Sequence, residues 1–148
     1  MTLYYLDASA WVKRYSLEKG SGWVRSLLQQ PGLLFACATL GFIEVSAALT
    51  RKQKAGEFQS DRWQDLLRAD WDRFLQVELS RAVVETAIQL LEHSPLRGAD
   101  ATHLASSLEL RTRLRPATEE FVFVASDREL KQAGHTAGLK VIDPEEQA

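Results

Sequence analysis

Short apolar runs alternate with amphipathic helical stretches along the whole chain, and this alternation limits the fold more than any other feature. Each apolar run has the length of a strand, and the segments between them place apolar residues three or four positions apart. Strands that alternate with helices form parallel sheets covered on both faces. We therefore expect an α/β fold with a parallel sheet of about five strands. The expected strands are Leu3–Leu6, Leu33–Ala36, Phe74–Leu79, Glu120–Val124 and Lys140–Ile142.

Turn and cap residues set the expected helix boundaries. The turn Pro31–Gly32 and the pair Ser94–Pro95 interrupt helical patterns, and Ser80 is a favourable N-cap. We find no linker or internal repeat, so residues 1–148 are expected to form a single domain. The expected helices are Ala8–Tyr15, Glu18–Gln29, Leu40–Lys54, Gln59–Arg73, one from Ser80 through Leu91, Ala99–Leu110 and Arg128–Ala137; Arg111–Glu120 is expected to be a polar connection, and Pro144–Ala148 a disordered tail.

The composition fits a globular protein and excludes several classes. Of the 148 residues, 45% are hydrophobic and 26% charged, and the net charge is −2. No run approaches the roughly 20 apolar residues of a membrane span. Cys37 is the single cysteine, which excludes an intrachain disulfide and a thiolate metal site. We expect a cytoplasmic protein without a membrane partner.

Four acidic residues lie in unusually apolar surroundings. Asp7 and Asp127 each end an apolar strand-like run, Glu44 is embedded in an apolar helical stretch, and Asp100 opens another. An unpaired buried carboxylate costs several kcal/mol. Because the carboxyl ends of parallel strands meet at one edge of a sheet, Asp7 and Asp127 are expected on the same edge. A divalent cation that binds all four acids would explain their placement.

Each acid also has a local explanation. Asp7 is a favourable N-cap for the helix after it. Asp100 lies in a first helical turn, where the helix dipole favours an anion, and it can pair with Arg97. Glu44 can be a surface acid on a mixed helix face, although its neighbours at helical spacing include no cation.

The segment around Asp127 fits a capping box. Ser126 is the expected N-cap and Glu129 its partner at the third helical position. This pattern leaves Asp127 without a required structural role, although an acid in a first helical turn is common.

If the four acids converge, their repulsion requires a bound cation or raised pKa values. Oxygen ligands favour Mg²⁺ or Mn²⁺, whereas zinc lacks a suitable Cys or His pair. Such a site suits phosphodiester hydrolysis by a metal-activated water, without a covalent intermediate. We expect Asp7 and Asp100 to be the closest ligands, with Glu44 and Asp127 binding directly or through water.

The acids and their flanking residues resemble the motifs of the PIN-domain family. Their order and spacing are most similar to the VapC-type toxins of toxin–antitoxin pairs, and the similarity extends over essentially the whole chain. The motifs are Leu6-Asp7-Ala8-Ser9-Ala10, Ile43-Glu44, Arg97-Gly98-Ala99-Asp100-Ala101-Thr102-His103-Leu104-Ala105 and Ala125-Ser126-Asp127-Arg128-Glu129-Leu130.

The resemblance implies a three-layer α/β/α fold and an endoribonuclease that depends on Mg²⁺ or Mn²⁺. It also implies a homodimer that a small antitoxin neutralises, with RNA as the substrate. Ser9 and Ser126 match hydroxyl positions beside the acids, where they can orient a carboxylate or a water. Arg14 and Arg97 are close to the acids in sequence and are candidates for substrate binding.

Other readings of the sequence stay open. A non-catalytic binding module, or a PIN nuclease that processes RNA or acts on DNA, would share the fold. A haloacid-dehalogenase-like phosphatase is disfavoured because Ser9 occupies the place of its second aspartate. A dinucleotide-binding fold lacks its Gly-rich loop. His103, one turn after Asp100, is read as a hydrogen-bonded structural residue rather than a proton shuttle.

Overall fold

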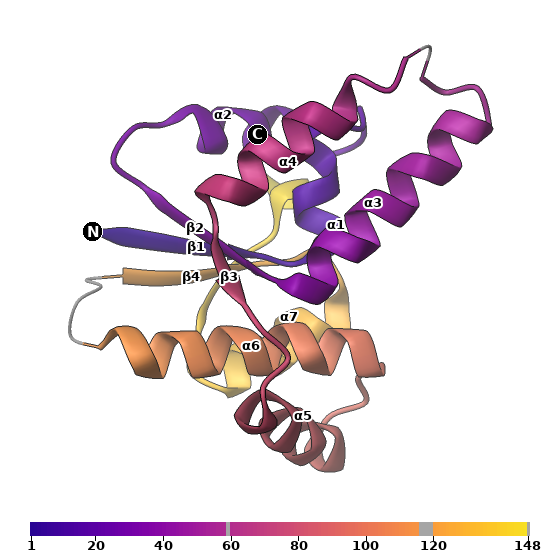
Figure 1. The fold of residues 1–148 in the computed structure, drawn as a ribbon. Helices are drawn as coiled ribbons and strands as arrows, with labels where there is room; N and C mark the ends of the chain where they lie inside the picture. Colours follow the sequence, from indigo (N-terminus) through magenta and orange to yellow (C-terminus); the bar gives the residue numbers. More distant parts are fainter. Residues whose placement is uncertain (59, 116–119, 148) are drawn as a thin grey trace.

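A sheet of five parallel strands forms the centre of the computed structural model, which describes residues 1–58, 60–115 and 120–147. The order across the sheet is β3-β2-β1-β4-β5, so β1 lies in the middle (Figure 1). The predicted parallel α/β sheet is therefore confirmed. The strands are β1 (Thr2–Leu6), β2 (Leu34–Ala38), β3 (Leu75–Val77), β4 (Glu120–Val124) and β5 (Lys140–Ile142).

Helices cover both faces of this sheet, which gives the predicted three layers. In Figure 1, α1 to α4 lie on one side and α5 to α7 on the other. The helical segments are α1 (Ala8–Trp11), the 3-10 turn η1 (Val12–Arg14), α2 (Ser21–Gln29), α3 (Thr39–Lys54), α4 (Trp63–Arg73), α5 (Arg81–His93), α6 (Gly98–Leu114), α7 (Arg128–Thr136) and the 3-10 turn η2 (Pro144–Glu146).

Neighbouring strand residues point to opposite faces and so build two separate cores. Tyr5 of β1 and Phe123 of β4 pack under α5, α6 and α7. Leu6 and Val124, one position further along the same strands, pack under α1 to α4. This explains why both strands read as continuous apolar runs.

Several boundaries differ from the sequence prediction; for example, α2 begins at Ser21 rather than Glu18, and β3 is shorter than Phe74–Leu79. The first predicted helix is split into α1 and η1, and α6 continues beyond Leu110 because Leu114 also packs against the core. Gln59 and residues 116–119 of the predicted polar connection lie outside the described residues, and α4 begins at Trp63, later than predicted. The predicted disordered tail is wrong for Pro144–Glu146, which form η2.

The aromatic core fixes α1, α3 and α4 relative to one another. Trp11 packs on Phe74 and Trp71 with ring centroids 4.8 and 5.6 Å apart, and Phe42 of α3 packs on Trp71 at 5.1 Å. The elements that carry Asp7 and Glu44 are thus held against one rigid cluster. Among the described residues we find no helix long and apolar enough to cross a membrane.

Candidate active site

Asp7 lies immediately after β1, at the carboxyl edge of the sheet, and is only 4% exposed. One carboxylate oxygen accepts the Ala10 N–H at 2.9 Å, which makes Asp7 the N-cap of α1. The Ser9 hydroxyl donates to the same carboxylate, at 2.9 and 3.0 Å from its two oxygens. All these donors are neutral, so the negative charge of Asp7 has no cation to balance it among them.

Burial raises the pKa of Asp7 from 3.8 to about 6. His103 and the donors from Ala10 and Ser9 oppose this rise, whereas the negative charge of Asp100 adds to it. The effect of Asp100 shows that the two carboxylates are near enough to interact electrostatically.

Asp100 lies in the first turn of α6, with its side chain 18% exposed. The Arg97 guanidinium approaches it at 3.4 Å and is itself 84% exposed. The predicted local pair therefore forms, but at the surface, where such pairs contribute about 0–1 kcal/mol. Arg97 is free to reorient toward an anion in solution.

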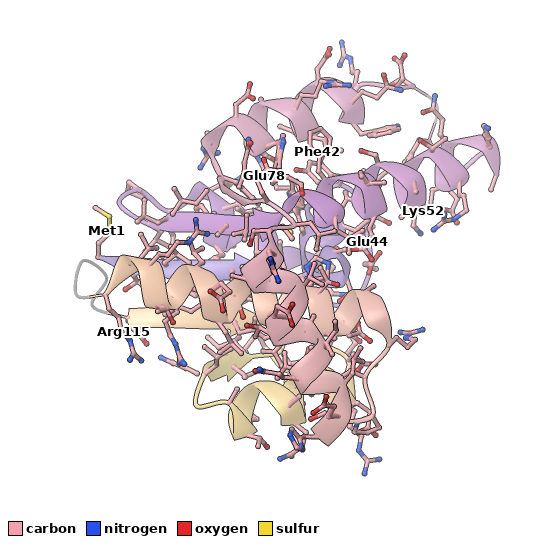
Figure 2. All side chains as sticks on the ribbon, turned by 60° about the horizontal axis from the view of Figure 1, so that its bottom comes forward. Met1, Phe42, Glu44, Lys52, Glu78 and Arg115 are labelled. Atoms are coloured by element: carbon pink, nitrogen blue, oxygen red, sulfur yellow. The ribbon has the colours of Figure 1, made fainter. Side chains whose placement is uncertain are left out.

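Glu44 projects from α3 toward α6, where Figure 2 labels it in the space between the two halves of the molecule. One of its oxygens lies 2.6 Å from Nε2 of His103, and its side chain is 32% exposed. The other nitrogen of His103, Nδ1, lies 2.9 Å from the hydroxyl of Tyr5. The structure thus confirms His103 as a hydrogen-bonded structural residue.

His103 and Cys37 lie beneath Asp7 and Glu44. Burial raises the pKa of the Cys37 thiol, and the charges of Asp7 and Glu44 raise it further, so both acids are near this thiol. Burial lowers the pKa of His103, but its contacts with Tyr5, Cys37 and Glu44 raise it by more. Two of the four predicted acids, Asp7 and Glu44, therefore both interact with the buried pair of Cys37 and His103.

Asp127 follows β4 and is the N-cap of α7, because its Oδ2 accepts the Leu130 N–H at 2.9 Å. The predicted capping box is therefore wrong: Ser126 is not the cap. Its hydroxyl instead donates to Asp143 at 2.7 Å. Asp127 lies at the same sheet edge as Asp7, since the Asp7 N–H donates to the carbonyl of Val124 at 3.1 Å.

Sequence reasoning missed Asp143, which follows β5 and is 7% exposed. Besides Ser126, it binds Lys131 at 2.7 Å and caps η2. Burial acts to raise its pKa, but Lys131 and Ser126 outweigh burial and lower it. An acidic residue directly after a strand is the sequence signal that could have singled out Asp143. Its ion pair with Lys131, however, gives Asp143 a structural role.

Arg14, a predicted substrate-binding residue, is occupied by an internal partner. Its guanidinium pairs with the buried Asp70 of α4, with Nε 2.6 Å from Oδ2. The Tyr15 hydroxyl donates to the same oxygen at 2.7 Å. Asp70 therefore competes with any phosphate for Arg14.

The donor set fits a hard divalent cation. Among the described residues, no group of three or more His, Cys, Asp or Glu side chains is arranged to enclose a metal ion. Mg²⁺, however, keeps several waters and takes only one or two carboxylates directly. Asp7 and Asp100 provide such a pair, and burial of Asp7, which His103 offsets only in part, favours a cation there.

Comparison with known proteins identifies the family. A model of the PIN domain matches residues 4–135. Ribonuclease VapC45 of Mycobacterium tuberculosis is 34% identical over 145 residues, covering 95% of each chain. PAE2754 from Pyrobaculum aerophilum shares the fold, with 20% identity, a TM-score of 0.62 and coverage of 98% of this chain and 93% of its own. A toxin–antitoxin complex from Klebsiella pneumoniae shares it with 16% identity, a TM-score of 0.61 and coverage of 95% and 97%. The chain belongs to the PIN domain family.

Proposed function

We propose that this protein is an endoribonuclease that depends on Mg²⁺ or Mn²⁺ and acts as the toxin of a toxin–antitoxin pair. The observation that supports this most directly is Asp7, a buried carboxylate at the sheet edge with neutral donors and with Asp100 in electrostatic reach. The ribonuclease VapC45, similar over nearly the whole chain, supports RNA as the substrate. Because the substrate is cellular RNA, the proposal places the protein in the cytoplasm.

The acids make a cation necessary for this activity. An acidic site repels a phosphodiester, whose charge has the same sign. Mg²⁺ or Mn²⁺ bound by Asp7 and Asp100, with Glu44 and Asp127 direct or through water, supplies neutralisation of the phosphate and activation of water.

The chain's own residues orient this site. Ser9 and the Ala10 N–H hold the Asp7 carboxylate in one direction, so it needs little reorganisation on binding a cation. Arg97, exposed beside Asp100, can pair with a phosphate of the RNA. Of the two predicted arginines it is better placed than Arg14, which Asp70 holds.

We also propose that a small antitoxin and a second copy of the chain bind this protein. A groove on α3 and α4 is lined by residues that include Phe42, Ile43 and Arg68, and Ile43 is 67% exposed. Because Glu44 is on the same helix, α3, an antitoxin segment bound in this groove would lie near that acid. The Klebsiella pneumoniae structure, a toxin–antitoxin complex of the same fold, supports this partner. Sedimentation of the purified chain with and without its neighbouring gene product measures both associations.

The decisive experiment is cleavage of a mixed cellular RNA pool by the purified chain, free of any copurified partner. Reactions contain Mg²⁺, Mn²⁺ or EDTA, and compare wild type with Asp100→Asn. Asp65→Asn is the matched control, because Asp65 is an exposed acid in the first turn of α4. Discrete cuts that require metal and Asp100 but not Asp65 support the proposal. Absence of both cleavage and metal binding favours the non-catalytic binding module, and cleavage of DNA alone favours a DNA-directed nuclease.

A further inference from the structure

We propose that Tyr5 and His103 form a relay that positions the Glu44 carboxylate at the site edge. This inference rests on the proposed function only for the role of Glu44 as a metal ligand. The relay itself rests on hydrogen bonds that run from the end of β2, through β1 and α6, to α3.

The relay begins at a group that can only donate. The Ala38 backbone N–H donates to the Tyr5 hydroxyl oxygen at 3.1 Å. A phenol keeps its proton at neutral pH, so the hydroxyl can also donate. Among the described residues, Nδ1 of His103 is the other group at hydrogen-bond distance from this hydroxyl, at 2.9 Å.

Tyr5 thereby decides which nitrogen of His103 faces Glu44. With Nδ1 held by Tyr5, Nε2 is the nitrogen that lies 2.6 Å from Glu44. A carboxylate can only accept, so Nε2 carries the shared proton, in a neutral ring and in an imidazolium alike. The imidazole therefore fixes one Glu44 oxygen and leaves the other to the site.

Close packing holds the relay in this position. Tyr5 is fully buried and His103 is 2% exposed. A Cβ on Gly41 of α3 would lie 2.2 Å from Sγ of Cys37 and 3.1 Å from Cε1 of His103. Only glycine at position 41 lets α3 approach near enough for Glu44 to reach the ring.

His103 is a positioning residue and not a catalytic one. Both ring nitrogens have partners and the side chain is sealed from solvent, so it has no free nitrogen to exchange a proton with RNA. A carboxylate ligand that is itself hydrogen-bonded is already oriented for the metal. Loss of such a supporting contact typically weakens metal binding about 10- to 100-fold.

The test measures Mg²⁺ affinity by calorimetry on the full chain without RNA. Tyr5→Phe removes only the relay hydroxyl, and Tyr15→Phe is the control because its hydroxyl belongs to the separate network around Asp70. We expect Tyr5→Phe to bind Mg²⁺ about tenfold more weakly and Tyr15→Phe to bind as wild type does. His103→Gln, whose amide can still donate to Glu44, is expected to recover part of the affinity lost in His103→Leu. Equal affinity of Tyr5→Phe and wild type overturns the relay.

Nitrogen NMR of the imidazole ring tests the relay without metal or substrate. The chain has three histidines, and His93 and His135 are exposed, so their substitution identifies the His103 signals. We expect a proton on Nε2 in wild type and a changed ring spectrum in Tyr5→Phe. An Nε2 without a proton overturns the relay. A wild-type protein that neither binds Mg²⁺ nor cuts RNA overturns the proposed function instead, and the ring spectrum still decides the relay.

Discussion

Asp7 and Asp70 are almost equally buried, at 4% and 2% exposed, but their electrostatic surroundings are opposite. Asp70 binds the guanidinium of Arg14 at 2.6 Å, with Arg73 at 3.5 Å. Asp7 accepts bonds from a hydroxyl and a backbone amide, and no lysine or arginine among the described residues pairs with it.

The difference separates a structural acid from a functional one. Where the chain supplies the cation, removing the acid leaves a buried positive charge unpaired, so the acid is needed for stability. Where the chain supplies no lysine or arginine and His103 offsets the charge only in part, the ionised acid destabilises the fold until a cation binds from solution. Burial alone does not distinguish these cases; the charge of the partner does.

The strongest test of this comparison exchanges each acid for asparagine. Asp70→Asn is expected to reduce the free energy of unfolding by about 3–5 kcal/mol, because Arg14 loses its partner. Asp7→Asn in EDTA is expected to leave stability unchanged or higher. Urea denaturation at pH 7.5 measures both. Similar losses in the two variants would contradict the distinction.

The pH dependence of stability provides the second test. The folded-state pKa of Asp7 is about 6 against an ordinary 3.8, so between these values the folded protein binds more protons than the unfolded chain. This group therefore stabilises the fold at low pH, and its contribution, at most about 3 kcal/mol, is lost as pH rises through 6. Denaturation of wild type and Asp7→Asn from pH 4 to 7.5, in EDTA, isolates the effect as their difference. A difference that is flat across this range would show that Asp7 is not desolvated.

Added metal tests the same comparison between Asp7 and Asp70, because a bound cation is expected to stabilise the protein only through the acid that lacks a lysine or arginine partner. At about 100 times its dissociation constant, a ligand that binds only the folded state stabilises it by about 2.7 kcal/mol. We expect Mg²⁺ to raise the melting temperature of wild type and of Asp70→Asn, but not that of Asp7→Asn. Sodium chloride at equal ionic strength is the control. A rise that persists in Asp7→Asn would place the cation elsewhere.

The two predicted hydroxyls give the smallest effect. Ser9 donates to Asp7, whereas Ser126 donates to Asp143. Each alanine substitution is expected to cost no more than about 1 kcal/mol of stability. Only Ser9→Ala is expected to weaken the stabilisation by Mg²⁺, which thermal unfolding with increasing Mg²⁺ measures. If Ser126→Ala has the larger effect on metal binding, Asp127 and its neighbours are closer to the cation than Asp7.

The sequence predicted the fold well because strand and helix patterns are local. The runs that end at Asp7 and Asp127 have strand length, and parallel pairing then brings both acids to one edge. Those two placements needed no knowledge of distant contacts. The capping residue at α7 was wrong because Ser126 and Asp127 are both good N-caps, and only the distant Asp143 decides between them.

Pairs distant in the sequence could not be predicted. Arg14 and Asp70 are 56 positions apart, and Glu44 and His103 are 59 apart. Nothing in the local pattern shows that Arg14 pairs with a buried acid. The reading of His103 as structural was confirmed, but its partners depend on how closely α3 approaches α6.

The close packing at Gly41 also makes the single thiol of the chain, Cys37, a probe of local opening. Cys37 has no exposed surface, and burial raises its pKa, so the thiol reacts with a reagent only after the packing around it opens. The rate at which a thiol reagent labels Cys37 therefore reports how often the structure around it opens. No engineered cysteine is needed, because Cys37 is the single cysteine of the chain.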